Sequence, residues 1–370
     1  MAWRSTGFDS PRVHIMKIVI LEPGAWGTAL GIILSRKNKV SFWYKDKNLG
    51  RKIFQARENE KLPEIKIPRK IFISSDLEKI IQSVELIIVA SPSFNLRKTL
   101  LELKGFKELP PILGIAKGIE KETLKLPSQI IKEVLPGTTY VHLSGPGFAR
   151  EVIRGKKTEE VITSVDRNLL KRSMKFASSG LPSSFAPRSL RSLEQLKELF
   201  QNKNLKISTT TDLIGVQLAG AIKNSLAIGI SLVEAARFNP ENKESRAVLI
   251  ALGLREMMII GKAMKAKEKT FSGPAGLGDL ILTSTDPLSR NFQFGKNLYL
   301  DAKKMRKDIK NKKITVEGFD TVFALHEIGK KYKLNLPMVD EIYKLIYKNI
   351  SPIKTVKNLI SLTKEACESG

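Results

Sequence analysis

The sequence predicts two parts, an α/β N-terminal domain with a doubly wound, mostly parallel sheet and an all-α C-terminal domain. Short apolar strands alternate with amphipathic helical stretches through the first half of the 370 residues. Strand patterns stop after about Thr211, and long helical segments follow. We therefore expect an N-terminal extension at 1–15, a sheet domain at 16–211 and a helical domain at 212–370.

The expected strands set the topology of the first domain. Lys17–Leu21 leads through a glycine turn into a helix, and Val40–Tyr44 returns as the next strand, which predicts a right-handed βαβ unit. Further buried strands are expected at Glu85–Ala90, Pro111–Ala116 and Tyr140–Gly145. Sheets of this kind bind ligands at the carboxyl ends of their strands.

Composition limits the classes of protein. The net charge is +26, but the basic residues are spread along the chain without a nucleic-acid motif, so no nucleic-acid partner is expected. Polar residues inside the most apolar helical stretch argue against a membrane span. The single cysteine, Cys367, suits a reducing cytoplasm. The three histidines show no metal-ligand spacing, so no metal is expected.

The turn after the first strand has the features of a Rossmann-like dinucleotide motif. Gly24 and Gly27 occupy the second and third glycine positions, where the backbone approaches a pyrophosphate, but Glu22 replaces the first glycine. A carboxylate beside a pyrophosphate is expected to weaken cofactor binding. Lys45 favours the 2′-phosphate of NADP and Asp46 the free ribose hydroxyl of NAD, so the sequence leaves NAD or NADP open.

Lys223 is the most informative residue of the helical half. It stands beside Asn224 in the apolar stretch 214–236, where lost hydration lowers the pKa of an ammonium group and suits it to proton transfer. Taken alone, the stretch favours the plainer interpretation that Lys223 extends to solvent. Polar motifs in other apolar segments favour a functional role for Lys223 instead. These motifs are Lys117-Gly118, SGPGFARE (144–151), GPAGLGDLILTST (273–285), Ser289-Arg290-Asn291 and VEGFDT (316–321).

These motifs together resemble the bacterial-type NAD(P)-dependent sn-glycerol-3-phosphate dehydrogenases. The matches are GAWGTAL, IAKGIE, SGPGFARE, GVQLAGAIKN, AGLGDL, SRN and VEG, in an order that spans Met16 to about Thr363. The resemblance implies a cytoplasmic oxidoreductase that transfers a hydride between NAD or NADP and dihydroxyacetone phosphate, giving sn-glycerol 3-phosphate for phospholipid synthesis. Oligomeric state is left open, with a homodimer as the assembly considered.

The resemblance also implies a role for each matching residue. Lys223 is the expected acid/base, and the other members of the expected catalytic group are Lys117, Asn224, Asp279 and Thr283. The expected substrate-binding residues are Lys117, Gly145, Lys223, Asp279, Ser289, Arg290 and Asn291. The expected cofactor-binding residues are Gly24, Ala25, Trp26, Gly27, Lys45, Lys117, Ala149, Arg290, Thr315 and Glu317.

Departures from the family pattern keep two alternatives open. An insertion of about twenty-five residues near 155–180 and the carboxylate of Glu22 would both fit a catalytically impaired relative that persists as a binding protein. Ser91 replaces a small apolar residue, with little expected consequence. A 6-phosphogluconate or hydroxyacid dehydrogenase of similar build is the other alternative, and it should lack the SRN and KN pairs found here.

Overall fold

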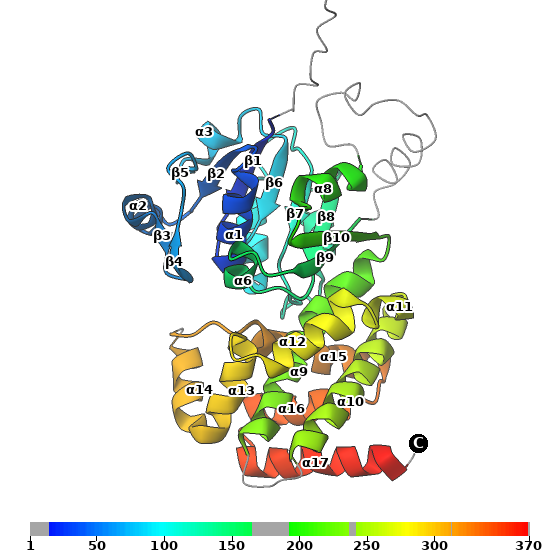
Figure 1. Cartoon of the computed structure of the whole chain (residues 1–370). Coiled ribbons are helices and arrows are strands. Elements are labelled where there is room, and N and C mark those ends of the chain that lie inside the picture. The colour runs from blue at the N-terminus through cyan, green and yellow to red at the C-terminus, as the bar shows by residue number, and fades with distance from the viewer. Residues whose placement is uncertain (1–14, 165–191, 237–241, 312, 369–370) are drawn as a thin grey trace, which may run out of the picture.

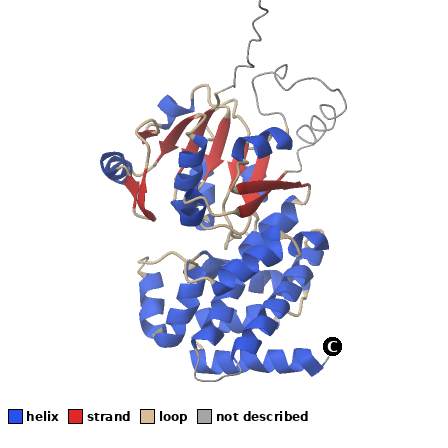
Figure 2. Cartoon of the chain, in the orientation of Figure 1, coloured by secondary structure: helices blue, strands red, loops and turns tan. Residues whose placement is uncertain are grey.

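The computed structural model describes residues 15–164, 192–236, 242–311 and 313–368. Figure 1 shows two parts, with the sheet and its helices above a bundle of helices. Figure 2 shows the strands of the described chain gathered in the upper part. The predicted fold class, a Rossmann-like α/β domain followed by an all-α domain, is confirmed.

An eight-stranded sheet forms the core of the upper part, in the order β10-β9-β8-β7-β6-β1-β2-β5. Neighbouring strands are parallel except for β8 and β9, so β9 and β10 run against the others. The strands are β1 Lys17–Leu21, β2 Lys39–Trp43, β5 Phe72–Ser74, β6 Leu86–Val89, β7 Ile112–Gly114, β8 Tyr140–Ser144, β9 Thr158–Thr163 and β10 Leu205–Thr210. A separate antiparallel hairpin contains β3 Glu58–Asn59 and β4 Leu62–Lys66.

All five strands expected from the sequence are present, and β5, β9, β10 and the hairpin are additional. β9 lies within the segment that the sequence pattern assigned to an insertion near 155–180. Its residues Val161 and Ile162 are buried and pair with β8 in the sheet. Residues 165–180 of that segment lie outside the described residues.

Helices cover both faces of the sheet, because the apolar side chains of β1 point alternately to one face and to the other. Ile18 and Ile20 pack in a cluster on one face, whereas Val19 and Leu21 pack in a cluster on the other. The helices of this part are α1 Ala25–Leu34, α2 Lys47–Ala56, α3 Leu77–Ile81, α4 Leu96–Leu101, α5 Pro127–Val134, α6 Ala149–Ile153 and α8 Leu193–Phe200.

The lower part is built around α9, Leu213–Ala235, which contacts most of the other helices. These are α10 Asn242–Ala263, α11 Glu268–Phe271, α12 Asp279–Thr285, α13 Arg290–Leu300, α14 Ala302–Lys310, α15 Glu317–Tyr332, α16 Pro337–Tyr347 and α17 Pro352–Glu368, with a π-helical turn at Pro274–Gly278. Within the described residues, α9 is the one helix long and apolar enough to cross a membrane, but 94% of its most apolar window is buried inside the protein. It is the core helix of this part.

The first half of α9 approaches the carboxyl end of the sheet at Gly220. A Cβ at this position would lie 2.7 Å from Ser144 Oγ at the end of β8, and 3.4 Å from Cγ of Lys117. Only glycine allows so close an approach without displacement of its neighbours. The contact brings the lysine of α9 to the edge of the sheet where ligands bind.

Candidate active site

A cavity of about 530 Å³ lies between the two parts. The sheet part contributes the turn Gly24–Gly27 and the loops that follow β6, β7 and β8. The helical part contributes side chains from α9, α12, α13 and α15. Strand ends from one part and helix faces from the other therefore enclose one space, whose volume lies in the usual range of ligand-binding cavities.

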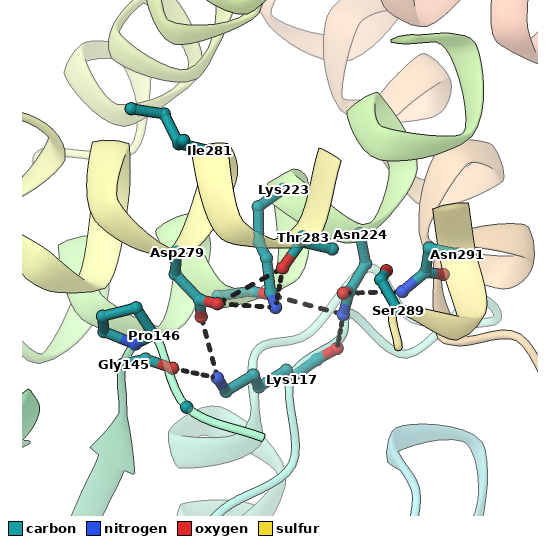
Figure 3. Close-up of polar contacts among 12 residues, drawn as sticks. Lys117, Gly145, Pro146, Lys223, Asn224, Asp279, Ile281, Thr283, Ser289 and Asn291 are labelled. Carbon is teal, nitrogen blue, oxygen red and sulfur yellow. Dashed lines mark hydrogen bonds and ion pairs between the residues drawn. The ribbon is translucent and has the colours of Figure 1, made fainter. Parts of the chain in front are cut away.

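Two lysines that line this cavity share one buried carboxylate (Figure 3). Asp279 accepts a hydrogen bond from Nζ of Lys223 at 2.8 Å through Oδ1, and from Nζ of Lys117 at 2.8 Å through Oδ2. Lys223 also donates to Oγ1 of Thr283 at 2.6 Å, and Lys117 to the carbonyl oxygen of Gly145 at 2.8 Å. The side chains of Lys223 and Asp279 are only 9% and 2% exposed.

Burial and charge set the protonation of these groups. Burial lowers the pKa of Lys223, and the Lys117 ammonium adds to this effect while Asp279 opposes it. Burial also acts on Lys117, but attraction to Asp279 and other carboxylates outweighs it and raises the pKa of Lys117. The two ammonium groups hold the pKa of Asp279 below its usual range despite its burial. Of the two lysines, Lys223 is thus the one prepared to give up a proton.

A chain of amide hydrogen bonds continues from the lysines toward α13 and α15. Asn224 donates through Nδ2 to the carbonyl oxygen of Lys117 at 3.1 Å, and to Oε2 of Glu317 at 3.3 Å. Asn291 donates to Oδ1 of Asn224 at 2.8 Å and accepts from the backbone N–H of Gly318 at 3.1 Å. These bonds fix the orientation of both asparagines beside the lysines.

The beginning of α13 is suited to an anion. Ser289 is the N-cap residue, and its hydroxyl accepts a hydrogen bond from the backbone N–H of Phe292. Arg290 follows as the first residue of the helix, is exposed and lines the cavity. A guanidinium at a helix N-terminus combines a fixed charge, two parallel donors and the helix dipole, which together suit a phosphate.

The turn that precedes α1 also lines the cavity. Gly24, Ala25, Trp26 and Gly27 all line the cavity, as does Ala149 at the start of α6. A Cβ on Gly27 would lie 2.6 Å from Cβ of Ala90, so glycine is needed for the close packing of α1 on the sheet. Backbone N–H groups at the start of this helix can therefore receive a pyrophosphate.

Glu22 does not direct its carboxylate at this turn. Its Oε1 accepts a hydrogen bond from the backbone N–H of Lys45 at 2.7 Å, at the end of β2. The residue has a φ of 53°, a conformation that favours glycine. Asp46 caps α2 by accepting from the backbone N–H groups of Asn48 and Leu49, and so it is already engaged.

The structure brings most of the predicted site residues together. Gly145 takes part through its bond to Lys117, and the other predicted residues line the cavity apart from Lys45 and Thr315. Lys45 forms an ion pair with Glu102, and Thr315 is an exposed residue just before α15. The predictions missed other lining residues, Glu160 on β9 and Lys61, Leu62 and Pro63 of the hairpin among them. The acidic pair Glu159-Glu160 directly before the apolar Val161-Ile162 was the available signal for Glu160.

Within the part of the chain that the structure describes, no group of three or more His, Cys, Asp or Glu side chains could hold a metal ion. His142 is fully buried in β8, and Nδ1 of its ring lies 2.8 Å from the hydroxyl of Tyr140. Burial and the nearby Lys117 ammonium lower the pKa of His142 to about 3, so its ring is neutral. The ionisable groups that line the cavity are lysine, arginine and carboxyl side chains.

Known proteins match this chain along nearly its whole length. Residues 17–170 match the family described as NAD-dependent glycerol-3-phosphate dehydrogenase N-terminus, and residues 212–357 match the corresponding C-terminus. Glycerol-3-phosphate dehydrogenase [NAD(P)+] of Thermoanaerobacter sp. (strain X514) is 32% identical over 352 residues, which cover 95% of this chain and 98% of that protein. The protein of the same name from Janthinobacterium sp. (strain Marseille) is 34% identical over 351 residues, covering 94% and 98%.

Solved structures agree with these relatives. The crystal structure of glycerol-3-phosphate dehydrogenase from Coxiella burnetii aligns with a TM-score of 0.80 at 26% identity and covers 94% of this chain and 99% of that one. The structure of D-mandelate dehydrogenase aligns with a TM-score of 0.58 at 15% identity and covers 93% of this chain and 99% of that one. This likeness shows the fold alone. The family expected from the sequence motifs is therefore confirmed: the chain belongs to the NAD-dependent glycerol-3-phosphate dehydrogenases.

Proposed function

We propose that this chain catalyses the reversible reduction of dihydroxyacetone phosphate to sn-glycerol 3-phosphate with a nicotinamide cofactor. One observation carries the proposal. The buried Lys223–Asp279–Lys117 group lines a cavity that is also lined by the glycine turn before α1 and by Arg290 at the start of α13. A ligand with a phosphate and a carbonyl group fits between Arg290 and the lysines, with the cofactor on the side of the glycine turn.

Lys223 is the proposed acid/base. When bound, the reduced cofactor supplies the hydride that the central carbon of the substrate receives. Lys223 gives a proton from Nζ to the carbonyl oxygen as the C=O double bond becomes an alcohol, and it takes that proton back in the oxidation. Lys117 holds a second positive charge near the same oxygen, where negative charge develops. Asp279 keeps both ammonium groups in position through its two oxygens.

Substrate orientation is assigned to the amide chain and to α13. Arg290 and the first turn of α13 are proposed to bind the phosphate, and Asn291 and Asn224 to orient the rest of the substrate. The two asparagines already bond to each other at 2.8 Å, so little ordering of these side chains is needed when the substrate binds. Ser289 supports this end by capping the helix.

Cofactor binding is assigned to Gly24–Gly27, Ala149 and Glu317, which all line the cavity. Whether NAD or NADP is preferred depends on the end of β2, where Glu22 and Glu102 both contact Lys45. Two carboxylates against one ammonium favour the uncharged ribose hydroxyl, and therefore NAD.

The same proposal includes three further statements. The sheet domain ends at residue 211 and the helical domain begins at 212, the protein is cytoplasmic, and its product supplies phospholipid synthesis. A homodimer stays a prediction.

The test is the oxidation of NADH and of NADPH by purified protein in the presence of dihydroxyacetone phosphate. Lys223→Ala should bind NADH as the unchanged protein does and lose at least about a hundredfold in turnover, the lower end of the effect of an acid/base. Lys357→Ala, which alters an exposed residue of α17, is the matched control and should keep full turnover.

Each result decides between the interpretations. Oxidation that depends on Lys223 supports the proposed reaction, and the ratio of the NADH and NADPH rates gives the cofactor preference. Near-normal turnover of Lys223→Ala would overturn the role of this residue. Folded protein that is silent with both cofactors would favour the impaired-relative interpretation.

A further inference from the structure

Glu160 is a buried carboxyl group in the cavity to which the family resemblance assigns no role. It lies in the middle of β9, between β8 and β10 in the sheet, and is 2% exposed. Among the described residues, no group forms a hydrogen bond with its buried Oε1. Its side chain nevertheless lines the cavity together with Lys117, Lys223 and Asp279. A buried carboxyl oxygen without a partner is costly, so a ligand is the natural source of the missing bond.

The loop after β8 fixes the position of this carboxyl group. A Cβ on Gly147 would lie 2.7 Å from Oε1 of Glu160, and a Cβ on Gly145 would lie 2.8 Å from Oε2. The carboxyl group therefore lies directly against this loop, where only glycine leaves room for it. The carbonyl oxygen of Gly147 in turn accepts a hydrogen bond from Nε1 of Trp26 at 2.8 Å. Gly147 thus lies close to both Glu160 and Trp26 of the α1 turn, and Gly145 of the same loop binds Lys117.

The protonation of Glu160 suits an uncharged partner. Burial raises the pKa of Glu160 to about 8, with Asp279 adding to the effect and the ammonium groups of Lys117 and Lys223 opposing it. Near neutral pH the group is mainly a carboxylic acid, which has one O–H donor and one carbonyl acceptor. A primary amide has the complementary pair, a carbonyl oxygen and an N–H, so the two groups can form two hydrogen bonds side by side.

We propose that Glu160 binds the carboxamide of the nicotinamide ring. The inference rests on the proposed function. A cofactor whose pyrophosphate lies on the turn of α1 and whose ring reaches Lys223 has to pass the Gly145–Gly147 loop, and therefore the carboxyl group of Glu160. Glu160 is a positioning residue in this arrangement, because it orients the ring and takes no part in the transfer of the hydride or the proton.

The proposal predicts that NADH binding depends on pH more strongly than NAD+ binding. Deprotonation of Glu160 removes the O–H donor, so the affinity for NADH should fall by about fivefold to tenfold as the pH rises through about 8, which is the effect of one hydrogen bond. The ring of NAD+ carries a positive charge, and its attraction to the carboxylate should offset the lost bond. The ratio of NADH to NAD+ affinity should therefore decrease with rising pH.

The experiment measures the equilibrium binding of NADH, NAD+ and adenosine diphosphate ribose between pH 6 and pH 9. Glu160→Gln keeps a donor and an acceptor but cannot ionise, so it should bind NADH within about twofold of the unchanged protein at pH 6 and show no loss at pH 9. Glu160→Val removes both groups and should weaken NADH binding at least about fivefold at pH 6. Adenosine diphosphate ribose lacks the nicotinamide, so its affinity should be equal in all three proteins at every pH.

Two results would overturn the proposal. One is unchanged NADH binding by Glu160→Val, and the other is the same pH dependence in Glu160→Gln as in the unchanged protein. Equal binding of adenosine diphosphate ribose shows that the variants are folded around an intact cofactor site. If the unchanged protein binds neither NADH nor adenosine diphosphate ribose, the proposed function itself fails, and that failure is distinct from the loss of a contact to the ring.

Discussion

Asp279 holds Lys223 by a 2.8 Å hydrogen bond from Nζ to Oδ1, and both side chains are almost completely buried. The second oxygen of the same carboxylate binds Lys117 at an equal distance. The site therefore places two positive charges on one negative charge among largely buried side chains. The net positive charge attracts an anionic substrate, and the two lysines differ in how readily they release a proton.

Removal of the shared charge should move the pH dependence of turnover. Asp279 raises the pKa of Lys223, so Asp279→Asn should lower that pKa further. Reduction of the ketone needs protonated Lys223, and its rate should therefore decline at a pH about one unit or more below that of the unchanged protein. The measurement is turnover against pH in the reduction direction. Asp301→Asn, which alters an exposed residue at the start of α14, should leave the profile unchanged, and an unshifted profile in Asp279→Asn would contradict the coupling.

Neutralising Glu22 should relax the choice of cofactor. Its carboxylate lies at the end of β2, where the adenosine ribose is held in sheets of this kind, and it should repel a 2′-phosphate. Glu22→Gln keeps the size and the acceptor for Lys45 N–H but removes the charge. We expect kcat/KM for NADPH relative to NADH to rise about tenfold in this variant, from a repulsion of roughly 1–2 kcal/mol. Glu22→Gly should show a similar rise, and an unchanged ratio in both variants would exclude the charge as the determinant.

Gly318 should not tolerate a methyl group. It lies at the start of α15 against α9, and a Cβ there would lie 2.4 Å from the backbone oxygen of Asn224. Gly318→Ala is expected to destabilise the fold by about 1–3 kcal/mol and to displace the Asn224 amide, which lowers turnover as well. Thermal unfolding and turnover measure the two effects. Gly105→Ala is the control, because nothing lies within 4 Å of its Cβ, and equal behaviour of the two variants would argue against tight packing here.

Glu256 should make stability depend on pH. This residue of α10 accepts hydrogen bonds from the backbone N–H groups of Met338 at 2.6 Å and Val339 at 3.1 Å. Burial raises its pKa from 4.5 to about 7 despite these bonds. Between those two values the folded state keeps a proton that the unfolded state has lost, so the free energy of unfolding should fall as the pH rises from 4.5 to about 7.

Thermal unfolding at pH 5 and pH 7 tests this expectation. In Glu256→Gln the group no longer titrates, so the decrease in midpoint from pH 5 to pH 7 should be smaller than in the unchanged protein. Glu244→Gln, an exposed change on the same helix, should leave the decrease as it is. An equal decrease in all three proteins would mean that other groups control this pH range.

Local sequence patterns determined the main elements and the members of the site. The five expected strands are present because buried runs such as KIVIL are apolar on both faces, and such runs form parallel strands whatever their partners. Lys223 and Asn224 were identified because polar residues are costly in an apolar helix unless they have a role or a partner. The ordered motifs then identified the family, which the comparisons with known proteins confirm.

Only the tertiary structure decided how these residues meet. Asp279 lies 56 positions from Lys223 and 162 from Lys117 in sequence, and the pairing arises because α12 packs on α9 and α9 contacts β8 of the sheet. The same holds for Glu22, whose carboxylate lies at the end of β2 because β1 and β2 are neighbours in the sheet. Glu160 lines the cavity because β9 lies beside β8 in the sheet. Periodicity in the sequence reports the surroundings of one element, whereas contacts between distant side chains depend on how several elements pack together.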